Sequence, residues 1–390
     1  MSVETVAAEA LDGLRARGTY RRMRVLEGPQ APRMRVDGRD VLLFAGSNYL
    51  DLAAHPEVVE ASARAARDWG CAAGGSRLIS GNLTLHEQLE QELAEFLGCE
   101  AALVFGTGYM ANVGLIPALV GSDDLIVSDA LSHASIIDGC RLSRAEVRVF
   151  THGDPAALDE VLSAARPHHR RALVALDGVY SMDGDVAPLP EMLATAHRHD
   201  AMVLVDDAHG TGTLGKRGRG SAELLGVDDR VDMLTGTLGK AMGSFGAFAA
   251  GSAALRDLLL NTARSFIFSC ALAPPQVEAA RAAVRLIARE PWRRERLASN
   301  TARLRTRLAE HGLSTSPSTT HIVPVIVGDN TRTMALCERL LERGFYAQGI
   351  RHPSVPEGSA RLRITPMATH DEAEIDALAD TIAAEWNRGA

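Results

Sequence analysis

The chain has 390 residues, enough for two or three domains, and its composition, 46% hydrophobic and 23% charged, is that of a globular protein. The formal net charge of −8 argues against a nucleic-acid-binding protein, whose contact surface is normally basic. Five scattered cysteines without a Cys-x-x-Cys pair predict neither a zinc site nor a disulfide framework, and no stretch has the length and apolarity of a membrane span or a secretory signal, so we expect a cytoplasmic protein.

Three regions follow one another along the chain. We expect an N-terminal helix and extension in residues 1–60, a large α/β domain in 61–290 and a smaller α+β domain in 291–390. In the large region, apolar runs typical of buried strands alternate with helical patterns such as Leu189–Arg198, which predicts a mostly parallel sheet covered on both faces. The apolar runs are Ala101–Phe105, Asp124–Ser128, Val147–Phe150, Ala172–Leu176 and Met202–Asp206.

Two candidate site segments follow the first two of these runs. In FGTGYMAN, the backbone amides of Gly108 and Tyr109 could hold a phosphate at the start of a helix, although a plain tight turn explains the same residues. In SDALSHASIID, His133 is a candidate site residue, and a core or capping histidine is the alternative.

The fifth run ends at Asp206, and His209 follows at the sheet edge where α/β proteins place their sites. A carboxylate there suits a pyridine nitrogen and the histidine a phenolic oxygen, while a helix cap is the alternative for Asp206. The stretch DDAHGTGTLGKRGRG also matches G-x-G-x-x-G. Because its aspartates separate the strand from the glycines and RGRG is a poor helix start, we do not expect a nucleotide site here.

Lys240 lies in the glycine-rich stretch TGTLGKAMGSFGAF. A P-loop is not indicated, because Leu234 stands where its first glycine would be and Ala241 replaces the hydroxyl residue that binds Mg²⁺. The small neighbours leave room for a bulky planar cofactor, whereas an exposed turn lysine is the alternative. Together with the segments above, this lysine predicts a pyridoxal phosphate (PLP) site, with Lys240 as the Schiff-base residue.

The last quarter of the chain has a different pattern. We expect a long helical stretch at about 276–312, further helices at Thr331–Arg343 and from Asp371, and strands at His321–Val327, near Phe345–Gln348 and at Arg361–Ile364.

Several long stretches resemble one known family. They are GGSRLISGN (Gly74–Asn82), DGVYSMDGDVAPLPE (Asp177–Glu191), DDAHGTGTLGKRGRG, GTLGKAMGSFGAF, SFIFSCALAPP (Ser265–Pro275) and RLRITPMATH (Arg361–His370). Over nearly its whole length the chain is similar to the α-oxoamine synthases, which are fold-type I PLP-dependent enzymes. The resemblance implies a large, mostly parallel sheet domain and a smaller C-terminal α+β domain.

The resemblance also implies roles for individual residues. Lys240 would form the internal aldimine, and Asp206 would pair with the pyridine nitrogen. His133 would stack on the ring, and Ser181 and His209 would approach the phenolic oxygen. The phosphate would be held by Gly108, Tyr109 and Thr237, with Ser269 of the second subunit of a homodimer whose active sites are shared. Arg363 would bind the substrate carboxylate, with Arg21 and Ser354 near the substrate; no metal is implied.

The reaction that the resemblance implies is a decarboxylative condensation of L-alanine with a pimeloyl thioester, carried by CoA or a carrier protein, in biotin biosynthesis. The chain departs from the usual family pattern at Ser47, Asp51, His352 and Ser354. Glycine or serine and other acyl thioesters therefore stay open as substrates. A PLP aminotransferase and a non-enzymatic dinucleotide-binding module are alternatives from other classes, and the module leaves Lys240 unexplained.

Overall fold

The computed structural model describes residues 1–388. The chain forms two compact units. The larger unit contains residues 47–181 and 185–297, and the smaller one contains residues 1–46 and 182–184 and the chain from Ala298 onward. The expected boundaries of three regions at residues 60 and 290 stay a prediction, because these two units are groups of residues in mutual contact and do not test where functional domains begin and end.

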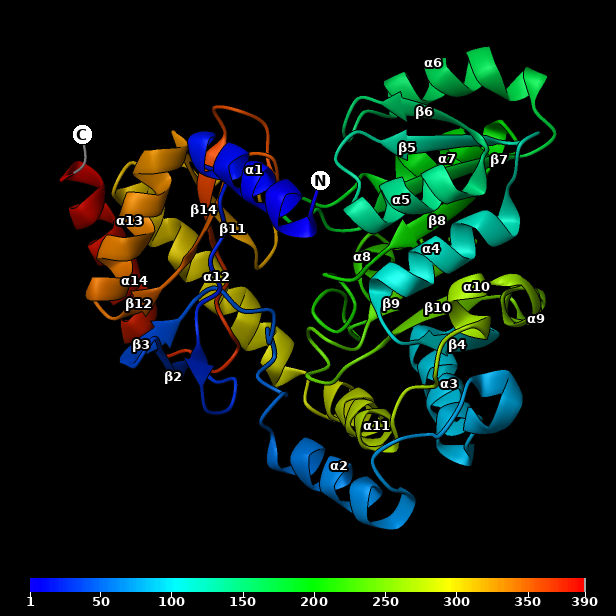
Figure 1. The fold of residues 1–390 in the computed structure, drawn as a ribbon, viewed down its shortest axis with the longest axis horizontal. Coiled ribbons are helices and arrows are strands. Elements are labelled where there is room, and N and C mark those ends of the chain that lie inside the picture. Colours follow the sequence, from blue (N-terminus) through cyan, green and yellow to red (C-terminus); the bar gives the residue numbers. More distant parts are fainter. Residues whose placement is uncertain (389–390) are drawn as a thin grey trace. The chain divides into compact units, whose positions relative to one another are not determined.

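The larger unit is built on a seven-stranded sheet with the order β4-β10-β9-β8-β7-β5-β6 (Figure 1). Strands β5 to β9 are parallel to one another, whereas β10 runs antiparallel to both of its neighbours, β4 and β9. The strands are β4 (Ala101–Phe105), β5 (Leu125–Asp129), β6 (Glu146–Phe150), β7 (Ala172–Asp177), β8 (Met202–Asp206), β9 (Met233–Thr237) and β10 (Ala247–Gly251).

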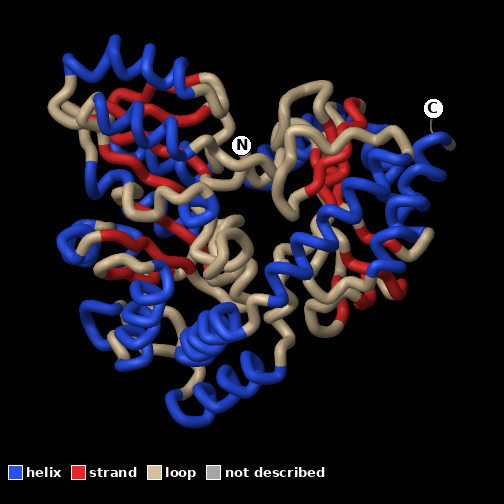
Figure 2. The backbone as a smooth tube through the Cα atoms, turned by 180° about the vertical axis from the view of Figure 1, so that it is seen from behind, coloured by secondary structure: helices blue, strands red, loops and turns tan. Residues whose placement is uncertain are grey.

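Helices cover both faces of this sheet (Figure 2). They are α2 (Pro56–Trp69), the π-helix η1 (Arg77–Gly81), α3 (Thr84–Leu97), α4 (Gly108–Leu119), α5 (Ala134–Ser143), α6 (Pro155–Ala165), the 3₁₀ turn η2 (Arg166–His168), α7 (Leu189–Arg198), α8 (Ser221–Leu224), α9 (Ala253–Thr262), α10 (Arg264–Ile267) and α11 (Pro274–Arg289).

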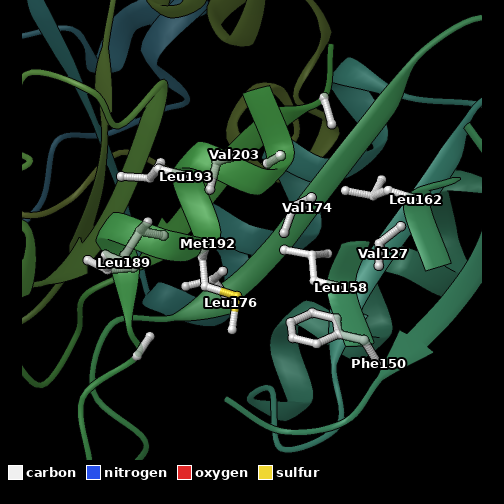
Figure 3. Close-up of a cluster of buried hydrophobic side chains, with 14 of the residues drawn as sticks. Val127, Phe150, Leu158, Leu162, Val174, Leu176, Leu189, Met192, Leu193 and Val203 are labelled. Atoms are coloured by element: carbon white, nitrogen blue, oxygen red, sulfur yellow. The ribbon is translucent and has the colours of Figure 1, made fainter. Parts of the chain in front are cut away.

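Side chains of the central strands alternate between two buried clusters. Val127, Val174 and Val203 pack with Leu158 and Leu193 of the helices α6 and α7 on one face (Figure 3). Their sequence neighbours Ile126, Leu173 and Leu204 pack with α4, α5, α9 and α10 on the other. The strands therefore read as continuous apolar runs, as expected for a sheet buried on both faces.

The smaller unit contains two further sheets, with the orders β1-β2-β3-β12 and β11-β14-β13. The strands are β1 (Leu26–Glu27), β2 (Arg33–Val36), β3 (Arg39–Leu43), β11 (Val323–Gly328), β12 (Phe345–Tyr346), β13 (Gln348–Ile350) and β14 (Ala360–Ile364). The helices are α1 (Val3–Ala16), α12 (Trp292–Glu310), α13 (Asn330–Glu342) and α14 (Glu372–Asn387), with the boundary between the units inside α12. Among residues 1–388 no helix has the length and apolarity to span a bilayer.

The structure corrects two expectations from the sequence. The helical stretch at about 276–312 is two helices, because α11 ends before Pro291, which has no backbone N–H to continue the hydrogen-bond ladder. The extension after α1 contains three short strands, β1 to β3, which pair with one another and, through β3, with β12. The other expected strands and helices of the last quarter are present within a few residues of their predicted limits.

Candidate active site

Three predicted site residues, Asp206, Thr237 and Lys240, come from the sheet edge at which β7, β8 and β9 end. Asp206 is the last residue of β8 and lies beside Asp177, the last residue of β7, in the parallel register. Thr237 ends β9, and Lys240 follows in the loop that leads to β10. Because the carboxyl ends of parallel strands share one edge, residues far apart in the sequence are brought together here.

Lys240, His209 and Tyr49 form a short chain of polar contacts. Nζ of Lys240 lies 2.9 Å from Nε2 of His209, and Nδ1 of that imidazole lies 2.8 Å from Oη of Tyr49. A charged ammonium has no lone pair, so it donates to Nε2, and the ring proton is then on Nδ1 and is donated to Tyr49. His209 and Tyr49 are both buried, which fixes the position of the lysine amine. The sequence analysis gave Tyr49 no role; its distance of 160 residues from His209 leaves no local signal.

Asp206 is buried and held by Asn112, which the sequence analysis also gave no role. The Asn112 amide donates from Nδ2 to Asp206 Oδ2 at 2.6 Å and to Ser135 Oγ at 2.9 Å, and its Oδ1 accepts from the Thr235 hydroxyl at 3.0 Å. Ala208 N–H donates to the other oxygen of Asp206 at 3.1 Å. These bonds orient the carboxylate, as a buried charge requires. The sequence did contain a signal for Asn112, because this polar residue stands within the mostly apolar stretch that forms α4.

His133 caps the N-terminus of α5, with an exposed side chain. Its Nδ1 lies 2.7 Å from Ser135 Oγ, and its backbone N–H donates to Asp177 Oδ2 at 2.9 Å. Burial, together with the charge of Asp206, raises the pKa of Asp177 well above its usual value, which limits the negative charge at this end of the sheet. The capping role and a site role coexist, because the cap uses Nδ1 and leaves Nε2 and the ring faces to other partners.

The start of α4 has the features of an anion site. The Thr107 side chain accepts from Met110 N–H at 3.1 Å, whereas the N–H groups of Gly108 and Tyr109 have no carbonyl one turn earlier to bind. Thr237 Oγ1 accepts from Gly239 N–H and donates to the Gly246 carbonyl, both at 3.1 Å, which fixes the loop that carries Lys240.

That loop needs a glycine at residue 243. Gly243 has a positive φ of 57°, and a Cβ atom there would lie 2.4 Å from the backbone nitrogen of Ala53. The close approach turns the chain immediately after Lys240, where Gly243 N–H donates to the lysine carbonyl at 2.9 Å.

Two glycines of DDAHGTGTLGKRGRG, Gly210 and Gly220, pack against the carboxyl group of Asp207. Asp207 Oδ2 accepts from Ser221 N–H at 2.9 Å, and Cβ atoms added at Gly210 or Gly220 would lie 2.2 Å or less from its oxygens. Burial raises the pKa of Asp207 to about 7. These glycines are therefore required by a buried side chain, and the helix that follows, α8, has only four residues.

Ser269 lies in a segment that contacts the first of the family-like stretches. Cys270 forms a β-bridge with Ser76, and Ala271 N–H donates to the Gly75 carbonyl at 2.9 Å. A Cβ atom on Gly81 would lie 2.1 Å from the Gly75 oxygen, so small residues are needed where these segments meet. Nearby Ile79 and Phe268 are 83% and 70% exposed, an unusual position for large apolar side chains.

Ser181 and the remaining predicted residues are placed as follows. Ser181 lies in the loop after β7, which is closed by a β-bridge between Val179 and Val186. In the smaller unit, Arg363 is buried on the central strand β14, and Arg21 donates to Ser354 Oγ at 3.1 Å. Arg21 and Ser354 line one cavity of about 1400 Å³.

Comparison with known proteins gives the family. Residues 39–382 match the model of the aminotransferase class I and II family. The chain belongs to this family. It is 50% identical to the 8-amino-7-oxononanoate synthase of Citrifermentans bemidjiense over 96% of both chains, and 52% identical to that of Geobacter metallireducens over 94% of both.

Solved structures agree with the fold-type I architecture. A serine palmitoyltransferase from S. paucimobilis, bound to a PLP–myriocin adduct, has a TM-score of 0.94 at 33% identity and covers 100% of this chain and 99% of its own. An 8-amino-7-oxononanoate synthase from Francisella tularensis has a TM-score of 0.77 at 25% identity, over 89% of this chain and 98% of its own. The expected fold class, family resemblance and PLP dependence are confirmed.

The donor set of the larger unit fits PLP. It offers a lysine amine, a buried and oriented carboxylate, and the backbone amides at the start of α4. There is open space beside those amides, because a Cβ atom on Gly108 would meet no heavy atom within 4 Å. These are the groups that a carbonyl, a pyridine nitrogen and a phosphate require.

Proposed function

We propose that this chain catalyses the decarboxylative condensation of L-alanine with a pimeloyl thioester. The products are 8-amino-7-oxononanoate, CO₂ and a free thiol, and the pathway is biotin biosynthesis. The observation that carries the proposal is the identity of 50–52% to curated 8-amino-7-oxononanoate synthases over nearly the whole of both chains.

PLP, when bound, supplies the electron sink that makes the α-proton of an amino acid removable. We assign its covalent attachment to the Nζ atom of Lys240, which is also the base that takes the substrate Cα proton once the amine is free. The 2.9 Å contact with His209 supports both roles, because the imidazole orients the amine and offers it a hydrogen-bond acceptor.

Asp206 would hold a proton on the pyridine nitrogen, and Asn112 keeps that carboxylate in position through its 2.6 Å bond. His133 would stack on the ring, Ser181 and His209 would contact the phenolic oxygen, and Gly108, Tyr109 and Thr237 would bind the phosphate. The arrangement of these groups around one sheet edge supports the assignment.

We assign Arg363 to the carboxylate of the amino acid, and Arg21 and Ser354 to the acyl substrate. A homodimer with shared sites completes the proposal, with Ser269 of one protomer at the phosphate of the other. The exposed Ile79 and Phe268 beside that segment support it, because a partner surface would cover them.

A second candidate is condensation of serine with a long-chain acyl thioester. The TM-score of 0.94 to a serine palmitoyltransferase favours it, but the identity of 33% to that enzyme is well below that to the synthases. A transaminase is the third, since the matching family model carries that name.

A substrate matrix tests the proposal. The PLP-loaded protein is given alanine, glycine or serine with pimeloyl, acetyl or palmitoyl thioesters, and amino ketones are measured by mass spectrometry. The proposal expects the highest kcat/KM for alanine with the pimeloyl thioester. A preference for serine with the palmitoyl thioester would establish the second candidate instead.

A further inference from the structure

A chain of hydrogen bonds connects the Asp206 carboxylate with the His133 ring. Asn112 Nδ2 lies 2.6 Å from Asp206 Oδ2 and 2.9 Å from Ser135 Oγ. The same hydroxyl lies 2.7 Å from His133 Nδ1. All four side chains belong to the larger unit, and those of Asn112, Ser135 and Asp206 are buried. Two intervening side chains therefore link the candidate carboxylate to the candidate stacking ring.

The two helices that carry the intervening side chains approach each other closely. Asn112 belongs to α4, and Ser135 is the second residue of α5. A Cβ atom on Gly139 of α5 would lie 2.8 Å from Ile116 Cδ1 and 3.0 Å from the Asn112 carbonyl oxygen. The glycine therefore lets α5 approach α4 closely enough for the short Ser135 side chain to reach the amide.

The direction of each hydrogen bond follows from groups that only accept. Thr235 Oγ1 lies 3.0 Å from Asn112 Oδ1, and the reversed amide would turn its oxygen toward the Asp206 carboxylate, which has no hydrogen to donate. Both amide hydrogens of Asn112 are thus donated, one to Asp206 and one to Ser135. The Ser135 oxygen accepts this hydrogen and directs its own toward His133 Nδ1.

The capping geometry of α5 places the ring proton of His133 on Nε2. Its Nδ1 atom accepts from the backbone N–H of Ser135 at 3.3 Å, and a backbone N–H only donates. Nδ1 therefore carries no proton, and the Ser135 hydroxyl at 2.7 Å is a second donor to it. An imidazole with a bare Nδ1 is neutral, and its Nε2–H group is its one donor.

The charges around the His133 ring oppose one another. Desolvation lowers the pKa of the imidazole, the charge of Asp206 raises it and that of Lys240 lowers it. Asp177 accepts from the His133 backbone N–H at 2.9 Å, but burial raises the pKa of Asp177 well above its usual value and so reduces its charge. The two donors to Nδ1 add a directional preference for the neutral ring to these opposed influences.

We infer that Ser135 is a positioning residue that, together with Asn112, keeps His133 neutral with its ring proton on Nε2. The inference rests on the proposed function, which stacks this ring on PLP and uses Asp206 to hold a proton on the pyridine nitrogen. A charged imidazole would repel a protonated pyridine ring and weaken its hold on that proton, whereas a neutral imidazole does not. The Asn112 amide thus serves both groups, because it orients the carboxylate and also directs the hydroxyl that keeps the histidine uncharged.

Nitrogen NMR of the PLP-loaded protein tests the inference without turnover. The imidazole rings are labelled with ¹⁵N, because the shift of each ring nitrogen reports whether it carries a proton. The chain has 13 histidines, so the His133 signals are identified as those missing from His133→Gln. In the wild type we expect a bare Nδ1 and a protonated Nε2 even at about pH 5.5, below the usual histidine pKa of about 6.5.

Variants of Ser135 separate its hydroxyl from its packing. Ser135→Ala should raise the titration midpoint of His133 by about 0.5–1 in pH, as expected for the loss of one hydrogen bond to the neutral form. Ser135→Thr keeps the hydroxyl and should restore the wild-type midpoint. Asn112→Leu removes the donor that directs this hydroxyl and should shift the midpoint upward as well. Ser143→Ala is the matched control, because it removes a buried hydroxyl at the other end of α5 that bonds to backbone groups, and it should leave the midpoint unchanged.

A His133 ring protonated on Nδ1 in the wild type at about pH 5.5 would overturn the inference, and this measurement needs no variant to fold. A Ser135→Ala midpoint equal to that of the wild type would also overturn it. The same holds for an equal shift in Ser143→Ala, or for a Ser135→Thr midpoint that stays with that of Ser135→Ala, because helix packing would then explain the change.

These outcomes are separable from failure of the proposed function, because the NMR measurement needs no amino acid and no thioester. The expected titration without amino ketone from any substrate pair refutes the reaction alone. Product from alanine and the pimeloyl thioester, with His133 protonated on Nδ1, refutes the positioning role alone. PLP loading should also move the ring-hydrogen resonances of His133, and unmoved resonances would show that this ring is wrongly assigned to the site.

Discussion

Nζ of Lys240 lies 2.9 Å from Nε2 of His209, although 31 residues separate them in the sequence. The imidazole is held on its other side by Tyr49, so the lysine amine is positioned by two buried side chains from separate segments. This arrangement suits an amine that must hold a cofactor and later move a proton, because both tasks require a fixed position.

Replacing Lys240 with alanine should abolish the covalent PLP linkage and turnover, while PLP still binds through the phosphate and Asp206 contacts. The visible absorbance of the linkage should be lost, and borohydride reduction of the wild type followed by peptide mapping should label Lys240. Lys216, in the neighbouring glycine-rich stretch, is the internal control. Labelling of Lys216 would show that the site is wrongly assigned.

Replacing Asp206 with asparagine should slow solvent exchange of the alanine α-hydrogen about 100-fold, equivalent to about 3 kcal/mol in activation free energy. The amide has nearly the same shape and can still accept from Asn112, but it has no charge to keep the pyridine nitrogen protonated. Thermal unfolding should change much less than the exchange rate. An unchanged exchange rate would remove Asp206 from this role.

The shared-site proposal predicts complementation between two inactive proteins. Lys240→Ala protomers mixed with Ser269→Asp protomers should regain activity, because one site of each mixed dimer combines the intact Lys240 of one chain with the intact Ser269 of the other. Random exchange limits recovery to about a quarter of wild-type activity, since half of the dimers are mixed and each has one intact site. The Ser269→Asp protein must be folded but inactive on its own. We expect it to be inactive because the introduced carboxylate repels the phosphate of PLP.

Two controls accompany this mixing experiment. Native mass spectrometry of the mixture must detect the mixed dimer, and Lys240→Ala mixed with the wild type must not exceed the wild-type activity present. Proven exchange without recovery, or sedimentation of an active monomer, would exclude the shared site.

His152 provides a test of pH dependence outside the proposed catalytic groups. Its Nδ1 lies 2.9 Å from Asp129 Oδ1 and its Nε2 2.9 Å from Asp185 Oδ2, and these bonds raise the pKa of His152 to about 10. Burial alone would raise the pKa of Asp129, but hydrogen bonds from His152, Leu131 and Gly153 outweigh it and lower that pKa. The cluster joins the ends of β5 and β6 to the loop that carries Ser181.

The His152→Gln variant should lose about 2–3 kcal/mol of unfolding free energy, as expected when one partner of a mostly buried ion pair is removed. Because the pKa of His152 is higher in the folded than in the unfolded protein, its ion pairs stabilise the fold fully at pH values below the unfolded-state pKa of about 6.5. This stabilisation is lost as the pH rises toward the folded-state pKa. The difference from the wild type should therefore be largest at about pH 5–6 and shrink between pH 7 and 10. Urea unfolding across this range measures it, with the exposed His168→Gln as control; a constant difference would contradict the account.

Periodicity and turn chemistry predicted most of the larger unit. β4, β8 and α7 have the predicted bounds, since buried strands and amphipathic helices have distinct local patterns. Strands β9 and β10 were not predicted, because MLTGT and AFAAG contain glycines and few β-branched residues. These two strands form through hydrogen bonds to neighbouring strands that are distant in the sequence, since β10 pairs with both β4 and β9.

Candidate site residues could be proposed from the sequence where they belong to a contiguous motif. Lys240, Asp206 and His209 belong to glycine-rich or strand-end motifs, so the sequence alone was enough to propose them as site residues. Asn112 and Tyr49 contact the site through partners 94 and 160 residues away, and such contacts follow from the fold alone.

The proposed reaction is tested most directly by following the carboxyl carbon of alanine. The PLP-loaded protein is incubated with L-alanine labelled with ¹³C in its carboxyl group and with a pimeloyl thioester, and labelled CO₂ and 8-amino-7-oxononanoate are quantified together. We predict equal amounts of labelled CO₂ and unlabelled amino ketone, both dependent on the thioester. Labelled pyruvate without CO₂ would establish transamination, and product that retains the label would contradict a decarboxylative condensation.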